Sequence, residues 1–166
     1  MKAITHIILC NTQTPEGQPV TPQQIIDWHT QSPQASGKPW NRPGFDVLIG
    51  LDGELHTLIN ENDPTPEDLW GISSGKHGLK GTFRYIAYVG GKTASGKTRK
   101  DTLTPAQEVT LAVIVNYYIK RFPQIVVAGL GTLPNMGNVL NPGFDVPKWL
   151  RAQGIPKAHH YIPKQL

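Results

Sequence analysis

Residues 3–10, Ala3-Ile4-Thr5-His6-Ile7-Ile8-Leu9-Cys10, are rich in β-branched and apolar side chains and decide how the rest of the 166-residue chain is interpreted. The polar run 11–17, which contains Pro15 and Gly17, follows at once. A short apolar run that ends in turn-forming residues is typical of a buried strand. The stretch therefore predicts a buried first strand of a sheet.

Two helices are predicted by the same pattern, a threonine N-cap followed by proline and, three residues after the cap, glutamine. Thr21 opens a helix that runs to about residue 31 and is expected to bury Ile25, Ile26 and Trp28. Thr104 opens the longest helix, which runs to about residue 121.

The remaining elements alternate between strand and helix. Asp52-Gly53 between two apolar runs predicts a hairpin. We predict strands over residues 45–50, 55–59, 84–89 and 125–128, and a short helix over 147–152. No repeat or linker divides the chain, so the prediction is a single α/β domain over residues 1–166, in which helices flank both faces of a central mixed sheet.

Composition excludes several classes of protein. An apolar content of 38% supports a packed core and excludes a disordered or fibrous chain. No apolar stretch approaches the roughly 20 residues of a membrane span, and residues 1–6 lack a signal-peptide pattern, so we expect a soluble chain synthesised in the cytoplasm. Cys10 is the only cysteine, which excludes an intrachain disulfide and a zinc site built from several cysteines.

Charge is distributed unevenly along the chain. Residues 1–83 carry five Lys and Arg against nine Asp and Glu, whereas residues 84–166 carry eleven against three. A basic half can bind an anionic partner such as nucleic acid or a cell-wall polymer. The simpler interpretation is a solvated surface, and we expect no nucleic-acid or membrane partner.

Residues 91–98 match the phosphate-loop pattern G-x-x-x-x-G-K-T and follow a predicted strand. A phosphate loop needs a helix to begin at Gly96-Lys97-Thr98, so that its N-terminus faces the phosphates. The helix signal comes only at Thr104. A basic surface loop is therefore the favoured interpretation, and nucleotide binding is a minor alternative.

The histidines offer no motif of their own, because neither HExxH nor GxSxG occurs. His6 and Cys10 lie four residues apart on one strand face, yet one strand does not make a metal site. A structural role is favoured for each of the six histidines.

Read end to end, the chain resembles the zinc-dependent N-acetylmuramoyl-L-alanine amidases, the family that includes phage lysozyme-amidases and peptidoglycan recognition proteins. The ordered set of matching pieces carries the resemblance, not any one of them. They are residues 7–17, 25–29, 44–47 with 51–53, 88–91 and 141–146.

The resemblance implies a zinc ion held by two histidines and a cysteine or aspartate, with a tyrosine and a lysine assisting hydrolysis. In this sequence the three ligand positions fall on Cys10, Leu130 and Asn141, and the tyrosine and lysine positions fall on Phe45 and Val139. Leu130 has no lone pair to donate, and Phe45 cannot stabilise an oxyanion. We therefore expect no zinc cofactor and a catalytically inactive pseudo-amidase.

The expected role is binding of a peptidoglycan fragment (a muropeptide) or of a protein partner, and the resemblance is compatible with a phage or prophage lysis cassette. The former active-site groove would be lined by Cys10, Asn11, Thr12, Phe45, Asp46, Leu130 and Asn141, unless apolar side chains have filled it. The alternative is an active amidase whose zinc ligands come from His6, Cys10 and either His77 or His159.

Overall fold

One mixed five-stranded sheet organises the residues that the computed structural model describes, which are 3–34, 37–63 and 69–163. Across the sheet the strands are β4 (Leu55–Thr57), β3 (Val47–Ile49), β5 (Phe83–Tyr88), β1 (His6–Asn11) and β7 (Val126–Gly129). All neighbouring pairs are parallel except β3 and β4, which form the predicted hairpin. The predicted α/β class with a central mixed sheet is confirmed.

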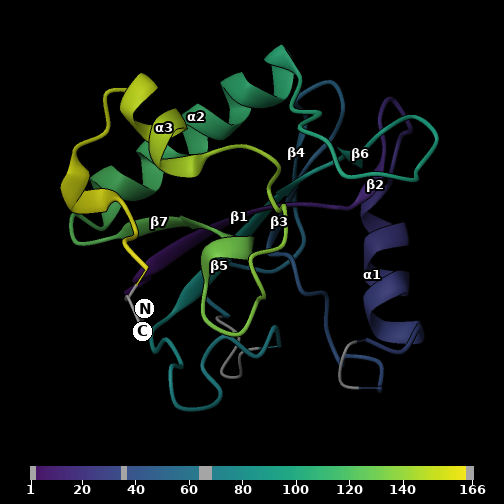
Figure 1. Cartoon of the computed structure of the whole chain (residues 1–166), viewed down its shortest axis with the longest axis horizontal. Helices are drawn as coiled ribbons and strands as arrows, with labels where there is room; N and C mark the ends of the chain where they lie inside the picture. Colours follow the sequence, from purple (N-terminus) through teal and green to yellow (C-terminus); the bar gives the residue numbers. More distant parts are fainter. Residues whose placement is uncertain (1–2, 35–36, 64–68, 164–166) are drawn as a thin grey trace.

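The stretch predicted as the first strand is the second strand from one edge of the sheet, between β5 and β7 (Figure 1). It begins at His6, and the backbone N–H groups of Thr5 and His6 both donate to the Thr82 carbonyl, at 2.9 and 3.2 Å. Ile7 to Cys10 are all buried, as expected for a parallel strand that is covered on both faces.

In the part of the chain that the structure describes, three helices cover the sheet. They are α1 (Pro22–Gln31), α2 (Pro105–Arg121) and α3 (Val146–Ala152), and the two longer ones begin where the sequence predicts. In α1 the Gln24 N–H donates to Thr21 Oγ1 at 3.2 Å while Gln24 Oε1 accepts from the Thr21 N–H at 2.8 Å. The same capping box closes around Thr104 in α2. Each box satisfies two otherwise orphaned backbone donors.

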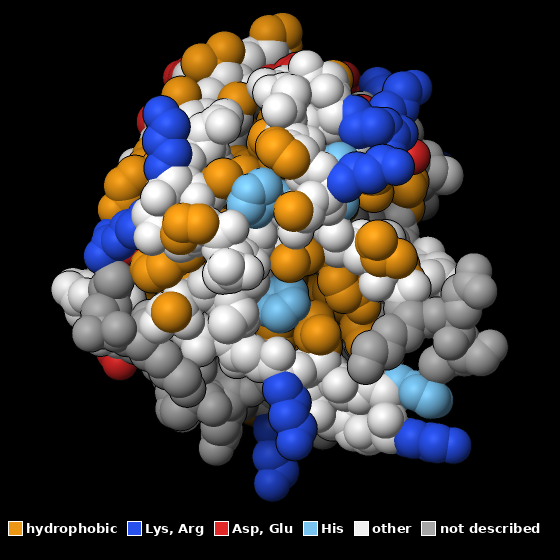
Figure 2. Space-filling view, turned by 90° about the vertical axis from the view of Figure 1, so that its left-hand side faces the viewer, with side chains coloured by type: hydrophobic (Ala, Val, Ile, Leu, Met, Phe, Trp, Pro, Cys, Tyr) orange, Lys and Arg blue, Asp and Glu red, His pale blue; other side chains and the backbone are white. Residues whose placement is uncertain are grey.

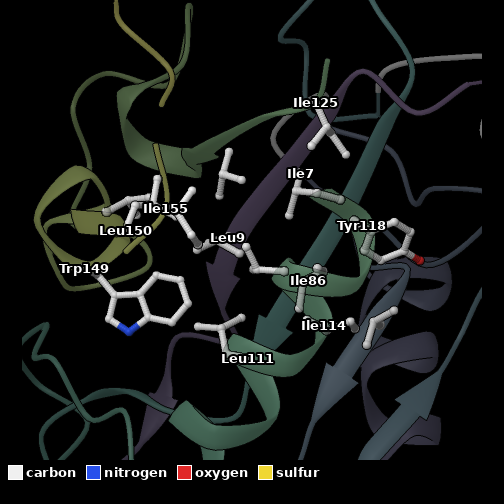
Figure 3. Close-up of a cluster of buried hydrophobic side chains, with 14 of the residues drawn as sticks. Ile7, Leu9, Ile86, Leu111, Ile114, Tyr118, Ile125, Trp149, Leu150 and Ile155 are labelled. Carbon is white, nitrogen blue, oxygen red and sulfur yellow. The ribbon is translucent and has the colours of Figure 1, made fainter. Parts of the chain in front are cut away.

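Alternate residues of β1 contribute to two separate cores. Ile7 and Leu9 pack with α2 and α3 in the cluster of Figure 3, where Leu111 and Trp149 project towards the sheet. Ile8 and Cys10 point the other way and pack beneath α1 and the loops of the second face. This alternation is the two-residue period of a strand, and it places the Cys10 and Asn11 side chains on opposite faces.

The structure corrects the expected burial of α1. Ile25 is buried, but Ile26 is only half-buried and Trp28 is 41% exposed. His29 lies inside instead, because residues four apart share one face of a helix, so Ile25 and His29 point towards the sheet together.

Smaller elements follow the main strands. The sequence did not predict the two-stranded sheet of β2 (Thr14–Pro15) and β6 (Gly91–Lys92), or the 3-10 turns η1 (Leu130–Thr132) and η2 (Lys157–His159). In the described ranges, no helix combines the length and the apolar character needed to cross a membrane.

Comparing alanine substitutions at a buried and at an exposed position of α2 should separate the contribution of core packing to stability from that of helix propensity. Leu111 is 2% exposed in the α2 cluster, whereas Val113 on the same helix is 66% exposed. Because Leu111→Ala leaves a cavity, we expect it to lower the free energy of unfolding by about 2–5 kcal/mol. Val113→Ala, the matched control, should change it by less than about 0.5 kcal/mol. Urea denaturation monitored by circular dichroism measures both, and equal effects would contradict the packing of Figure 3.

Candidate functional site

The carboxyl ends of β1, β5 and β7 lie at one edge of the sheet, where parallel α/β sheets place their ligand sites. Cys10 and Asn11 close β1, and Leu130 follows β7 directly. The candidate positions are therefore brought to the same end of neighbouring strands, and their surroundings determine what each can do.

Cys10 is buried in hydrocarbon, with only 1% of its surface exposed. Its thiol lies 3.7 Å from the Ile8 carbonyl, to which it donates. Burial, and secondly the nearby Asp46 carboxylate, raises the pKa of the Cys10 thiol well above its usual value. Because the thiolate is the form that binds metal or attacks a carbonyl, this environment disfavours both roles.

Leu130 and Phe45 extend the same apolar cluster. Leu130 is the first residue of η1 and is fully buried. The Phe45 ring stacks on Trp70 at 5.5 Å between centroids and meets the His29 ring edge-on at 5.0 Å. Hydrocarbon thus occupies positions where a polar group would be needed to bind a metal or a developing negative charge.

Asn141 and Asn11 form hydrogen bonds that connect the end of β1 to the loop before α3. The Asn11 backbone N–H donates to Asn141 Oδ1 at 2.8 Å, and Asn11 Nδ2 donates to the Pro142 carbonyl at 2.8 Å. Val139, half-buried, accepts from the Asn141 N–H through its backbone carbonyl at 2.9 Å. These bonds fasten the loop before α3 onto the end of β1.

Thr12 and Asp46 also have partners within the protein. Thr12 Oγ1 accepts from the Gly90 N–H at 3.0 Å. Asp46 is buried, accepts from the Tyr85 N–H at 2.7 Å and faces Arg84 Nη1 at 3.3 Å. Burial raises the pKa of Asp46, while the Tyr85 hydrogen bond and the Arg84 charge oppose that shift. Both side chains therefore serve the fold at these contacts.

The residues do not fit the zinc site that the resemblance implies. Within residues 3–34, 37–63 and 69–163, no three His, Cys, Asp or Glu side chains come together in a way that could hold a metal ion. His6 and Cys10 are about 13 Å apart along β1, at about 3.3 Å per residue. His159 Nδ1 lies 2.8 Å from the Ile125 carbonyl, and His77 lies in a separate loop.

The phosphate-loop match forms a β-hairpin. Thr93 donates its N–H to the Thr98 carbonyl at 2.9 Å, and Lys100 donates to the Gly91 carbonyl at 2.9 Å. α2 begins only at Pro105. Among the described residues no helix begins at Gly96-Lys97-Thr98, so the mechanism of a phosphate loop has no basis there.

A hollow of about 450 Å³ lies over the same face of the sheet as Cys10 and Leu130. Residues from three segments line it, 76–79, 132–135 with 137–138, and 161–163. Leu133 joins the hollow to the buried cluster that contains Cys10. Figure 2 views the molecule from the side of the chain ends, where hydrophobic side chains gather across the middle of the face, with histidines among them and Lys and Arg nearer the edge.

Hydrogen bonds hold the walls of this hollow together. Asn135 Nδ2 donates to the Gly71 carbonyl at 3.0 Å and to the Ser74 carbonyl at 2.6 Å. The Tyr161 N–H donates to the Val127 carbonyl of β7 at 3.1 Å. The sequence singled out His77 but missed the other polar lining residues, because they come from three distant loops and form no local motif.

Comparison with known proteins identifies the fold through solved structures. The sequence matches no protein-family model and no curated protein. The endolysin of the Thermus scotoductus bacteriophage Ph2119 has a TM-score of 0.62 and 20% identity, over 94% of this chain and 88% of that chain. N-acetylmuramoyl-L-alanine amidase LysC from Clostridium intestinale URNW has a TM-score of 0.64 and 19% identity, over 93% and 88%.

A second kind of protein shares the fold. The ectodomain complex of peptidoglycan recognition proteins LCa and LCx, solved with tracheal cytotoxin bound, has a TM-score of 0.58 and 15% identity, over 97% of this chain and 86% of that chain. At such identities the likeness shows the fold alone. The chain thus has the fold common to these amidases and recognition proteins, as the sequence resemblance predicts.

His29 should make stability depend on pH. Burial lowers its pKa to about 4, from 6.5 for an ordinary histidine, and the Gly44 N–H donates to its Nδ1 at 2.8 Å. Between these values the unfolded ring binds more protons than the folded one, so the free energy of unfolding should fall as the pH drops from 6.5 to 4, by up to about 3 kcal/mol.

Urea denaturation at several pH values measures this dependence. His29→Gln keeps an acceptor for the Gly44 N–H but cannot become charged, and should flatten the curve over that window. If the free energy of unfolding of the variant depends on pH as steeply as that of the wild type, groups other than His29 cause the dependence.

Proposed function

We propose that this chain is a catalytically inactive amidase-like protein that binds peptidoglycan fragments through the hollow beside β7. The observation that carries the proposal is the contrast between two neighbouring regions. The residues at the family's catalytic positions are buried or bonded within the protein, whereas the hollow next to them stays open.

Three features support the loss of hydrolysis. Leu130 and Phe45 offer no lone pair to zinc or hydrogen bond to an oxyanion. Asn141 Oδ1 already accepts the Asn11 N–H. The thiol of Cys10 is held in its neutral form by burial. A zinc cofactor is accordingly not part of the proposed function.

The lining of the hollow suits a sugar-peptide ligand. Lys76 can pair with a carboxylate of a stem peptide, while His77, Asn138 and the Tyr161 hydroxyl can bond to amides and sugar hydroxyls. Leu79 and Leu133 supply apolar surface for alanyl methyl groups. A concave apolar surface with a few polar groups is the usual form of a small-molecule site.

The relatives in fold support the same class of ligand. By their names, two are an endolysin and an N-acetylmuramoyl-L-alanine amidase, and the third recognises peptidoglycan. A bacteriophage protein among them supports a phage or prophage lysis setting for this chain.

Binding can be tested by co-sedimentation with purified peptidoglycan sacculi. We expect saturable pelleting that soluble muropeptide abolishes. Lys76→Ala/His77→Ala should weaken binding by about ten-fold, since hydrogen bonds to charged groups contribute about 1.5–3 kcal/mol.

The matched control is His56→Ala/Lys120→Ala, which removes the same two residue types outside the hollow and should bind like the wild type. If the wild type stays in the supernatant, the muropeptide proposal fails and a protein partner becomes the function to test.

Catalysis and metal content are tested separately. We expect no release of stem peptide from muropeptides and less than 0.1 zinc per chain by mass spectrometry of the protein purified with added zinc, an order-of-magnitude bound that follows from the missing ligands. Release of stem peptide that Cys10→Ser abolishes would overturn the proposal in favour of an active amidase.

A further inference from the structure

The hairpin of residues 91–100 begins with β6, which pairs with β2, and it lies on the opposite side of the molecule from the face in Figure 2 (Figure 1). It contains Lys92, Lys97, Arg99 and Lys100, and the rest of its turn is made of small residues. It belongs neither to the sheet core nor to the hollow, so its charge needs a separate explanation.

Lys92 and Arg99 are direct cross-strand neighbours. The hydrogen bonds on either side of them, Thr93 to Thr98 and Lys100 to Gly91, make theirs a non-hydrogen-bonded pair. In such a pair the Cα atoms are only about 4.5 Å apart and both side chains rise from one face. Like charges directly opposite one another destabilise a hairpin.

Glu16, the acidic residue that is ion-paired to this hairpin, does not pair with Lys92 or Arg99. Glu16 forms its ion pair with Lys100, whose side chain points to the other face of the hairpin from Arg99, because adjacent residues alternate. In the described part of the chain, no ion pair involves Lys92, Lys97 or Arg99. The half-buried Lys92 and the exposed Lys97 and Arg99 thus share one short hairpin, and in the described residues none of them is ion-paired to a carboxylate.

We infer that this hairpin is a binding site for a linear phosphodiester polymer of the cell wall. A phosphate placed between Lys92 and Arg99 would remove their repulsion, and the small residues Ala94, Ser95 and Gly96 leave the turn open to a polymer chain. The hairpin has no aromatic side chain on which a nucleobase could stack, which disfavours single-stranded nucleic acid.

The evidence for an anion site is the charge of the hairpin alone, whereas the choice of a cell-wall polymer as the ligand rests on the proposed function. The two are separable by experiment, because a poly(glycerol phosphate) polymer contains no stem peptide and no residue of the hairpin lines the hollow. Failure of polymer binding would therefore leave muropeptide binding to the hollow intact, and the reverse also holds.

The test uses isothermal titration of the full chain with poly(glycerol phosphate) at several salt concentrations. The variant Lys92→Gln/Arg99→Gln should bind at least about ten-fold more weakly and lower the slope of log K against log salt by about 1.5–2. The control Lys148→Gln/Arg151→Gln removes the same charge from exposed positions of α3 and should bind within about two-fold of the wild type.

Thermal unfolding gives a second measurement. Because the substitution removes a repulsion, Lys92→Gln/Arg99→Gln should raise Tm by about 1–3 °C. No polymer binding at low salt, equal losses in the two variants, or a lower Tm of the hairpin variant would each overturn the inference. Tighter binding of a single-stranded DNA oligonucleotide with the same number of phosphates would reassign the hairpin to nucleic acid.

Discussion

The burial of β1 between β5 and β7 is the constraint on which the rest of the structure depends. Both edges of the strand are hydrogen-bonded and both faces are covered, so each side chain enters one of two cores. Cys10 faces the cluster beneath α1, and Asn11 faces the loop before α3, where it binds Pro142. The chemistry available at the end of β1 therefore depends on these two environments, the apolar cluster around Cys10 and the hydrogen-bonded loop around Asn11.

The two environments determine how the residues at the end of β1 are used. At the end of β1 and β7 the apolar side chains of Cys10, Leu130 and Phe45 pack against one another. On the other face, two asparagines exchange hydrogen bonds with the backbone rather than with solvent. Packing and hydrogen bonds within the protein thus engage the side chains at this edge of the sheet, and the hollow is lined by the loops nearby.

The sequence predicted most of the fold because its signals were local. Capping boxes at Thr21 and Thr104 and the turn at Asp52-Gly53 place elements without any knowledge of tertiary contacts. Which face of α1 is buried was predicted less well. The sequence favoured burial of the large apolar Trp28 over the polar His29. In the structure His29 is the buried residue, because its ring packs against Phe45 and Trp70. The hollow beside β7 could not be predicted, because its lining comes together only in three dimensions.

The pairing of β1 also has a consequence for how the chain reaches this structure. His6 is aligned with Phe83 on one side and with Val126 on the other, so the strand that is synthesised first receives its partners late. Contacts so distant in sequence require closure of long loops, and folds rich in them form slowly. During synthesis both edges of this apolar strand stay unpaired until β5 and β7 have emerged, and unpaired edges promote association between chains. We therefore expect the sheet to close only after β7 has been synthesised, with association between nascent chains as the competing reaction.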